Sequence, residues 1–235
     1  MFFEIARAIK EIQPSYVLLE NVKGLFSHDG GRTFGTIIQT LDELGFITEW
    51  GLFNSKYWGV PQNRERVYIL ATRKDKFKEP LLFDLVKQQT EVTTRLIDVL
   101  EDEVDEKYYL SEEKTRKLTL DHDLSGKLNF YNYNETDKVY SVNKVGPTLN
   151  TMQGGNRQPK IAVREATKQG YAIAEQGVRI RKLTEKECWR LQSFTDEQFY
   201  KAKDSGVSNS QLYKQSGNAI TISVADAIIK KITEG

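Results

Sequence analysis

The sequence has very little of the two residue types that build disulfides and many metal sites. It contains one cysteine, Cys188, which excludes a disulfide within the chain, and two histidines, His28 and His122. Neither histidine has a recognisable partner in the sequence, so little material is left for a metal site, and we predict none.

Charge of one sign is also scarce. The 34 Lys and Arg residues balance the 33 Asp and Glu residues to a net charge of +1, so any nucleic-acid site must be a local patch. No apolar run approaches membrane-spanning length, and the start, Met1-Phe-Phe-Glu-Ile, does not look like a signal peptide. With 39% hydrophobic and 29% charged residues in a chain of 235, we expect a soluble, cytoplasmic protein of one large or two small domains.

The stretch from Tyr16 to Gly24 organises the first part of the chain. Tyr16 to Leu19 are apolar without alternation, which predicts a short, central strand covered on both faces of a parallel sheet. The run ends in Glu20 and Asn21, and ligands of open α/β sheets bind beyond the carboxyl ends of the strands. Glu20 therefore either reaches into a cleft or simply leaves the sheet for water.

The rest of the first 74 residues has the periodicity of α/β proteins. We predict helices over residues 2–12 and 34–44, with Gly45 at the end of the second, and further strands over residues 46–53 and 67–71. This part of the sequence is therefore expected to form about three strands.

After Lys74 the sequence becomes highly charged and loses its periodicity, and residues 139–174 hold short β-prone pieces cut by glycines. This pattern predicts a second, irregular and partly β domain. A capping box at Thr184-Glu-Lys-Glu187 predicts a helix to about Phe194, and a last helix is expected from Ile220 to about Ile232.

Three polar motifs are candidates for a site. In Gln62-Asn-Arg-Glu-Arg66 an extended backbone would point residues 62, 64 and 66 the same way, and an amide with two guanidinium groups can hold a phosphate, a carboxylate or a base carbonyl. The alternative is an exposed, charged strand end. The stretch from Gly146 to Arg157 combines hydroxyls, amides, an arginine and paired glycines, which suits either a ligand-reading loop or ordinary turns.

The third motif, Ser216-Gly-Asn-Ala219, precedes the last helix. Asn218 can cap that helix, or the same backbone amides can hold a carboxylate. Cys188 falls within the capped helix and is expected to be a core residue, not a nucleophile.

Taken in order, these segments resemble the C5-cytosine DNA methyltransferase family. The resemblance covers residues 1–74 and 139–235. It rests on Glu20-Asn21-Val22, on Gln62, Arg64 and Arg66 before Val67-Tyr-Ile, on Thr148-Leu149, on Arg181-Lys-Leu-Thr-Glu-Lys-Glu-Cys-Trp-Arg-Leu-Gln-Ser-Phe194, and on Gln211-Leu-Tyr-Lys-Gln-Ser-Gly-Asn-Ala219. It implies an α/β fold: a Rossmann-like methyltransferase sheet, here its C-terminal part, with a small irregular, partly β target recognition domain.

The resemblance also implies a reaction and its residues. Such enzymes flip a cytosine out of double-stranded DNA, add a cysteine thiolate at C6, and methylate C5 with S-adenosyl-L-methionine. Glu20 would contact the base, Arg66 would brace Glu20 and reach the base carbonyl, and Arg64 would stabilise the same cleft. Asn218 and Ala219 would lie at the cofactor. The residues expected at the DNA are Gln62, Thr148, Thr151 and Arg157.

The sequence also departs from the family pattern. The Pro-Cys dipeptide that carries the nucleophile and the earlier cofactor loop are not found in it. We therefore expect domains over residues 1–77 (catalytic, C-terminal part), 78–178 (target recognition) and 179–235 (helices returning to the catalytic domain).

The expected function is DNA cytosine-5 methylation of the restriction-modification type, with this chain inactive alone and a complementing N-terminal fragment or subunit as its partner. The alternatives are a non-catalytic DNA-binding subunit and an inactive, truncated remnant. An unrelated α/β nucleotide-binding protein is disfavoured, because no glycine-rich phosphate loop follows a strand.

Overall fold

A computed structural model describes residues 2–152, 156–164 and 177–234. The chain divides into two compact units. The first comprises Met1–Asn54, Glu65–Glu91 and Val224–Gly235, and the second comprises Ser55–Arg64 and Val92–Ser223. The predicted domain boundaries at residues 77 and 178 stay a prediction.

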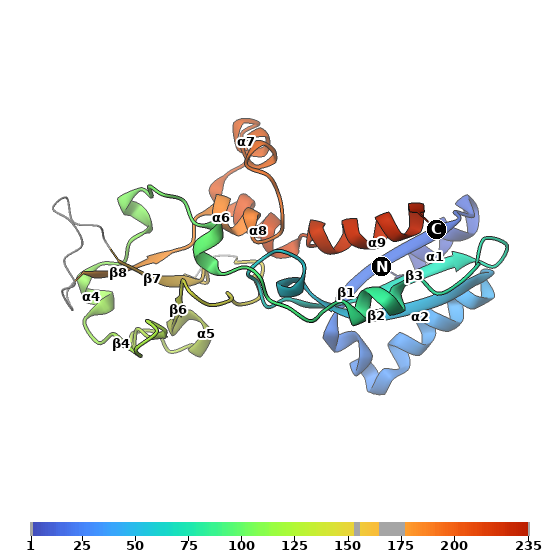
Figure 1. Ribbon diagram of the computed structural model, residues 1–235, viewed down its shortest axis with the longest axis horizontal. Helices are drawn as coiled ribbons and strands as arrows, with labels where there is room; N and C mark the ends of the chain where they lie inside the picture. The colour runs from blue at the N-terminus through green and yellow to red at the C-terminus, as the bar shows by residue number, and fades with distance from the viewer. Residues whose placement is uncertain (1, 153–155, 165–176, 235) are drawn as a thin grey trace. The chain divides into compact units, whose positions relative to one another are not determined.

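The first unit is built on a three-stranded sheet (Figure 1). Its elements in chain order are α1 (Phe2–Ile12), β1 (Tyr16–Val22), α2 (Arg32–Glu43), β2 (Phe46–Asn54), β3 (Glu65–Arg73), α3 (Leu82–Lys87) and most of α9 (Ile222–Glu234). The strand order is β1-β3-β2, and β3 runs antiparallel to both of its neighbours. The two helices and three strands predicted for this part of the sequence are therefore confirmed. Their ends agree within about two residues, except that the Tyr16 strand continues three residues past Leu19, to Val22.

The predicted parallel pairing of the Tyr16 strand is wrong for the described residues. In this sheet β1 lies at an edge, pairs antiparallel with β3, and is only partly buried. The central strand is β3, whose residues from Val67 to Ala71 are almost completely buried. The apolar run of β3 is the longer of the two and fills both faces of the sheet, which the short run at Tyr16 does not.

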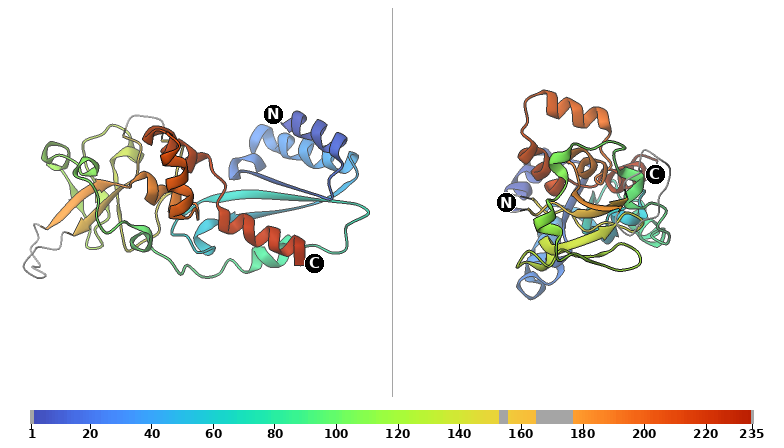
Figure 2. Two further views of the ribbon diagram at one scale, coloured as in Figure 1. Left: turned by 90° about the horizontal axis from the view of Figure 1, so that it is seen from above. Right: turned by 90° about the vertical axis from the view of Figure 1, so that its left-hand side faces the viewer.

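Helices cover both faces of this sheet. Figure 2 shows α1 and α2 on one face and α3 and α9 on the other. The core under α1 and α2 contains Ile9, Leu41, Phe46, Val67 and Ile69. Every second residue of β3 contributes to this core, as the alternation of side chains along a strand requires.

The second unit contains a five-stranded sheet of short strands, in the order β4-β5-β6-β7-β8. Its strands are β4 (Thr119–Leu120), β5 (Gly126–Lys127), β6 (Lys138–Ser141), β7 (Lys160–Arg164) and β8 (Val178–Lys182). Its helices are α4 (Glu112–Thr115), α5 (Asn134–Asp137), α6 (Glu185–Arg190), α7 (Asp196–Asp204) and α8 (Asn209–Asn218). Of the strand pairs, β6 with β7 is parallel and the others are antiparallel. The irregular, partly β character predicted for this region is confirmed.

The predicted capping box at the start of α6 is present. Thr184 Oγ1 accepts a hydrogen bond from Glu187 N, and the Glu187 carboxylate accepts one from Thr184 N. The same carboxylate pairs with the Arg181 guanidinium at 2.7 and 2.8 Å, and both side chains are buried. One carboxylate therefore fixes the helix start and its connection to β8. The helix ends at Arg190, before the predicted end at Phe194.

Candidate functional site

The end of β1 carries the pair of charged groups that the sequence singled out. Residues Val22 of β1 and Arg66 of β3 face each other in the sheet, and Glu20 faces Tyr68. This register brings Glu20 Oε1 to 2.9 Å from Arg66 Nε, and both side chains are mostly buried. The Arg66 Nη1 group also donates to Glu65 O at 2.8 Å, which fixes the guanidinium beside the carboxylate.

One oxygen of this carboxylate is buried and still lacks a hydrogen bond. Glu20 Oε1 lies close to Arg66 Nε, but no donor of the described chain makes a hydrogen bond to it. A buried acceptor in this state is unfavourable by about 1–3 kcal/mol, and such atoms need an explanation, for example a ligand. The pair can therefore accept a hydrogen bond from a bound polar group.

Gln62 is completely buried in the second unit, with both ends of its side-chain amide in use. Its Nε2 donates to Leu191 O at 2.7 Å, and its Oε1 accepts from Leu149 N at 3.0 Å. A direct contact between this amide and DNA would require these bonds to break. In the structure Gln62 links the predicted recognition loop to the end of α6.

Arg64 is also buried in the second unit, with 3% of its surface exposed. Its guanidinium donates to three backbone carbonyls: Leu149 O at 3.0 Å, Gly217 O at 3.2 Å and Ala219 O at 2.8 Å. Gln62 and Arg64 thus bond within the second unit, whereas Arg66 bonds within the first. The three side chains do not share one set of partners.

The two segments that Arg64 joins are in direct contact. A Cβ atom built on Gly217 would lie 2.0 Å from Asn150 O, so only glycine allows this approach. Gly217 belongs to the last turn of α8, and Asn150 to the predicted recognition loop. The Ser216-Gly-Asn-Ala219 segment is therefore a platform for that loop.

The other predicted site residues lie around this platform. Thr148 is exposed and donates through Oγ1 to Asn63 O, and Thr151 is half-buried. Arg157 is exposed and has no partner among the described residues. Asn218 is exposed, and Ala219 is half-buried. Gly154 and Gly155 of the same predicted loop lie outside the described residues.

Asn218 does not cap the last helix. It is the final residue of α8, and α9 starts four residues later at Ile222. The sequence pattern does not predict α8, so the segment was expected just before a helix, whereas it lies at the end of one.

Cys188 is a core residue, as its position in the sequence indicated. It lies completely buried among Leu149, Leu183, Leu191 and Tyr213. Burial, with smaller contributions from Glu187 and Glu185, raises the pKa of its thiol well above the ordinary value. A thiol in this setting is neither ionised nor accessible to a substrate.

The structure also shows a group of residues to which the sequence analysis gave no role. Tyr131, Tyr133 and Tyr140 line a pocket of about 520 Å³ together with Arg157 and Asn150. The only signal in the sequence was the density of aromatic residues between Phe130 and Tyr140.

Within residues 2–152, 156–164 and 177–234, no three or more His, Cys, Asp or Glu side chains are grouped as in a metal site. No helix in these ranges is both long and apolar enough to cross a membrane.

Comparisons with known proteins agree on one family. The sequence profile of the C-5 cytosine-specific DNA methylase family matches residues 1–234. The orphan methyltransferase M.SPBetaI of Bacillus phage SPbeta is 37% identical, and the alignment covers 99% of this chain and 69% of that protein. The type II methyltransferase M.SsoII of Shigella sonnei is 36% identical, with 99% of this chain and 56% of that protein covered.

Solved structures support the same fold. The Dnmt2 methyltransferase of S. pombe superposes with a TM-score of 0.70 at 18% sequence identity, over 98% of this chain and 70% of that protein. The DNMT2 of Spodoptera frugiperda gives a TM-score of 0.66 at 20% identity. The predicted Rossmann-like methyltransferase fold is thereby confirmed, and the chain belongs to the C-5 cytosine-specific DNA methylase family.

Proposed function

We propose that this chain takes part in S-adenosyl-L-methionine-dependent methylation of cytosine C5 in double-stranded DNA, in a restriction-modification setting. In this proposal Glu20 and Arg66 hold the cytosine. The family match and the type II and orphan methyltransferases among its relatives support the reaction class.

The observation that carries the assignment of Glu20 is its buried oxygen without a hydrogen bond. Cytosine offers an exocyclic amino group that can donate to such an oxygen, and a carbonyl that can accept from a guanidinium. Thiolate addition at C6 pushes electrons onto N3 and the carbonyl of the base, so transfer of a proton to N3 through the Glu20 carboxyl group and pairing of the carbonyl with Arg66 stabilise the addition. Because Arg66 lies 2.9 Å from Glu20, it keeps the carboxylate in place before the base arrives.

Two residues of the second unit suit the cofactor. Asn218 presents an exposed carboxamide, with both a donor and acceptors, at the end of α8. Arg64 holds the neighbouring carbonyls of Gly217 and Ala219, so the backbone that carries Asn218 is fixed. This arrangement fits the amino-acid end of S-adenosyl-L-methionine, which supplies an electrophilic methyl group when bound.

The nucleophile has to come from other residues. Cys188 is the only cysteine of the sequence, and it is buried with a raised pKa. We propose that a polypeptide carrying a Pro-Cys motif and a cofactor loop completes the enzyme and adds a strand beside β1. The edge position of β1 in the described sheet supports this partner.

The test measures transfer of a labelled methyl group to DNA by the chain alone and after addition of such a polypeptide. We expect background incorporation from the chain alone and sustained incorporation from the completed enzyme. In that enzyme Glu20→Gln should lower the methylation rate about 100-fold and change DNA affinity little, because an amide cannot transfer the proton and that transfer acts mainly in the transition state.

Glu65→Gln is the matched control, since Glu65 lies on β3 in an exposed pair with Lys23. It should leave the rate unchanged. Equal loss of rate and DNA affinity in Glu20→Gln would contradict the proposed role. Sequence-specific DNA binding without methylation in any completed complex would instead identify a DNA-binding subunit.

A further inference from the structure

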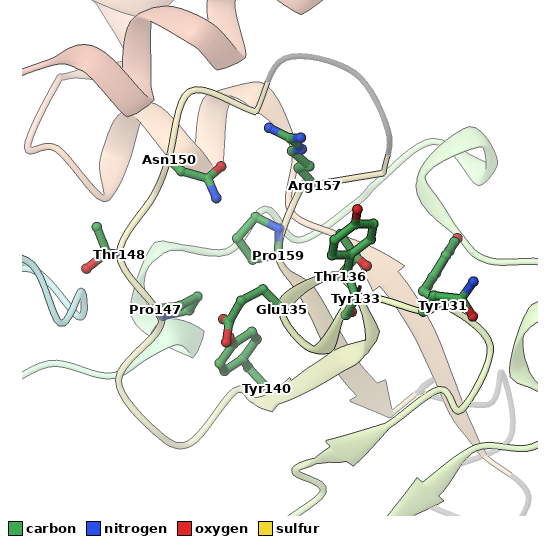
Figure 3. A pocket seen from close by; sticks show the side chains of 11 residues that line it. Tyr131, Tyr133, Glu135, Thr136, Tyr140, Pro147, Thr148, Asn150, Arg157 and Pro159 are labelled. Carbon is green, nitrogen blue, oxygen red and sulfur yellow. Dashed lines mark hydrogen bonds between the residues drawn. The ribbon is translucent and has the colours of Figure 1, made fainter.

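The pocket of about 520 Å³ in the second unit has walls from two separate segments (Figure 3). One is the segment around α5 and β6, with Tyr133, Glu135 and Tyr140, and the other is the predicted recognition loop. Figure 3 shows Asn150 and Arg157 on one side of the pocket and Glu135 and Tyr140 on the opposite side. The two sides differ in charge, so the pocket favours a ligand with two different polar edges.

A buried carboxylate fixes the side of the pocket that is formed by the segment around α5. Asp137 accepts hydrogen bonds at 2.9 Å from the backbone N–H groups of Asn129, Phe130 and Tyr131. Burial alone would raise the pKa of Asp137, but these three hydrogen bonds outweigh it and keep the pKa below its ordinary value. The turn that leads to Tyr133 is therefore fixed without any ligand.

The loop wall is held by a buried lysine. Lys160 Nζ donates to Asn156 O at 2.6 Å and to Gln158 O at 3.2 Å, the two residues that flank Arg157. The same ammonium lies 5.3 Å from the centre of the Tyr131 ring and so contacts the other wall as well. The backbone that carries Arg157 is thus fixed, while its side chain is exposed and has no partner among the described residues.

The lining has the chemistry of a site for a flat, polar heterocycle. Tyr133 is 79% exposed, and an exposed aromatic ring beside charged side chains in a pocket is typical of base stacking. Arg157 offers a fork of donors, and Glu135 offers a carboxylate whose Oε1 pairs with Lys138 at 2.6 Å. The Tyr131 hydroxyl is buried without a hydrogen bond to the described chain. A phosphate alone would not use the tyrosines, and an apolar ligand would leave the Arg157 guanidinium and the Tyr131 hydroxyl without a hydrogen bond.

We propose that this pocket takes one unstacked base of the DNA, other than the cytosine that is methylated, and that it prefers guanine. Guanine is the base whose O6 and N7 match an arginine fork, while its N1–H and amino group match a carboxylate. All the lining residues belong to the second unit, whereas Glu20 and Arg66 belong to the first. The inference rests on the proposed DNA substrate.

The experiment is an abasic scan combined with substitution of the pocket. Duplexes selected from a random pool by the completed enzyme are remade with a single abasic nucleotide at each position in turn, and the Kd of each is measured. For the unsubstituted protein we expect one position, apart from the target cytosine, where loss of the base weakens binding about 10-fold. Tyr133→Ala should weaken binding of the intact duplex by a similar factor and be insensitive to the abasic change at that position.

Three further variants sharpen the result. Tyr133→Phe keeps the ring and should bind like the unsubstituted protein. Arg157→Lys keeps the charge but loses the fork, so it should lose the preference for guanine at that position. Tyr200→Ala, an exposed tyrosine of α7 outside the pocket, should behave like the unsubstituted protein.

An equal effect of Tyr133→Ala on every abasic duplex would overturn the inference and leave the proposed function intact. Saturable binding of free guanosine monophosphate, without coupling to any duplex position, would also overturn it. Failure of the completed enzyme to bind or methylate any DNA would refute the proposed function itself.

Discussion

At the scale of single residues, Lys160 fixes the loop around Arg157 but lowers the stability of the folded protein at neutral pH. Its side chain is almost completely buried. Burial and repulsion from Lys182 and Lys114 lower its pKa from 10.5 to about 8, and attraction from Asp137 offsets only part of this. The folded protein therefore releases this proton at a lower pH than the unfolded chain does. The resulting penalty is largest below pH 8 and disappears as the pH rises towards 10.5.

We predict that between pH 7 and pH 10 the free energy of unfolding rises by roughly 2–3 kcal/mol more in the unsubstituted protein than in Lys160→Met. Urea unfolding at several pH values measures this difference. The comparison with Lys160→Met removes the contributions of the other groups that titrate in this range. Parallel pH profiles of the two proteins would show that Lys160 has the same pKa in the folded and unfolded chain, and so would contradict this prediction.

At the scale of elements, the contact between α8 and the recognition loop depends on one glycine. A methyl group at position 217 would lie 2.0 Å from Asn150 O, a backbone atom that cannot move without its loop. Gly217→Ala should therefore reduce stability by about 1–3 kcal/mol, as overpacked sites do, and lower DNA affinity by displacing the loop.

Thermal unfolding and DNA titration test this prediction together. The control is Gly35→Ala in α2, where a Cβ meets nothing within 4 Å and the higher helix propensity of alanine should be neutral or stabilising. Unchanged DNA affinity in Gly217→Ala would mean that the loop adapts without the platform.

The comparison of elements also shows what sequence patterns can and cannot predict. The helices α1, α2 and α9 and the three strands of the first unit follow from apolar periodicity, because each has an apolar stripe or run in the sequence. The helices α7 and α8 were missed, since their apolar residues are few, although Thr195 and Ser208 cap them. The alternation of side chains along an extended backbone predicted that Gln62, Arg64 and Arg66 point the same way. Their spacing along the chain does not predict which carbonyl oxygens each side chain will contact.

The charges of the site were the most predictable part, and its scaffold the least. Glu20 and Arg66 come together because the adjacent strands β1 and β3 align them, and the family resemblance had already implied that Arg66 braces Glu20. The role of Gly217 depends on a neighbour that is 67 positions away in the sequence, at Asn150, and so cannot be read from local pattern.

At the scale of the whole molecule, the edge of the first-unit sheet has consequences for solution behaviour. In the described residues β1 pairs on one side only. Its last residue, Val22, and Ile12 at the end of α1 are exposed apolar side chains. Unpaired strand edges and apolar surface promote association. We predict that the isolated chain self-associates and that the completing polypeptide converts it to a soluble one-to-one complex.

Size-exclusion chromatography with light scattering gives the mass of each species, and amide exchange across residues 16–22 reports on β1. We expect fast exchange in the isolated chain and slow exchange in the complex. A stable monomer with slow exchange in β1 would contradict this expectation.

The three carbonyls bound by Arg64 also bear on how recognition specificity can be exchanged between relatives. Because one guanidinium holds Leu149, Gly217 and Ala219, the recognition loop shares its anchor with a segment near the other end of the sequence. A recognition segment that is transplanted alone would lack the hydrogen bonds from Arg64. It would also lack the contact with Gly217, where only glycine leaves enough space for the loop. Chimaeras of this family should therefore take residues 64, 149 and 217 and the residues that contact them from one parent. Natural relatives that exchange recognition specificity should likewise exchange or retain these positions together.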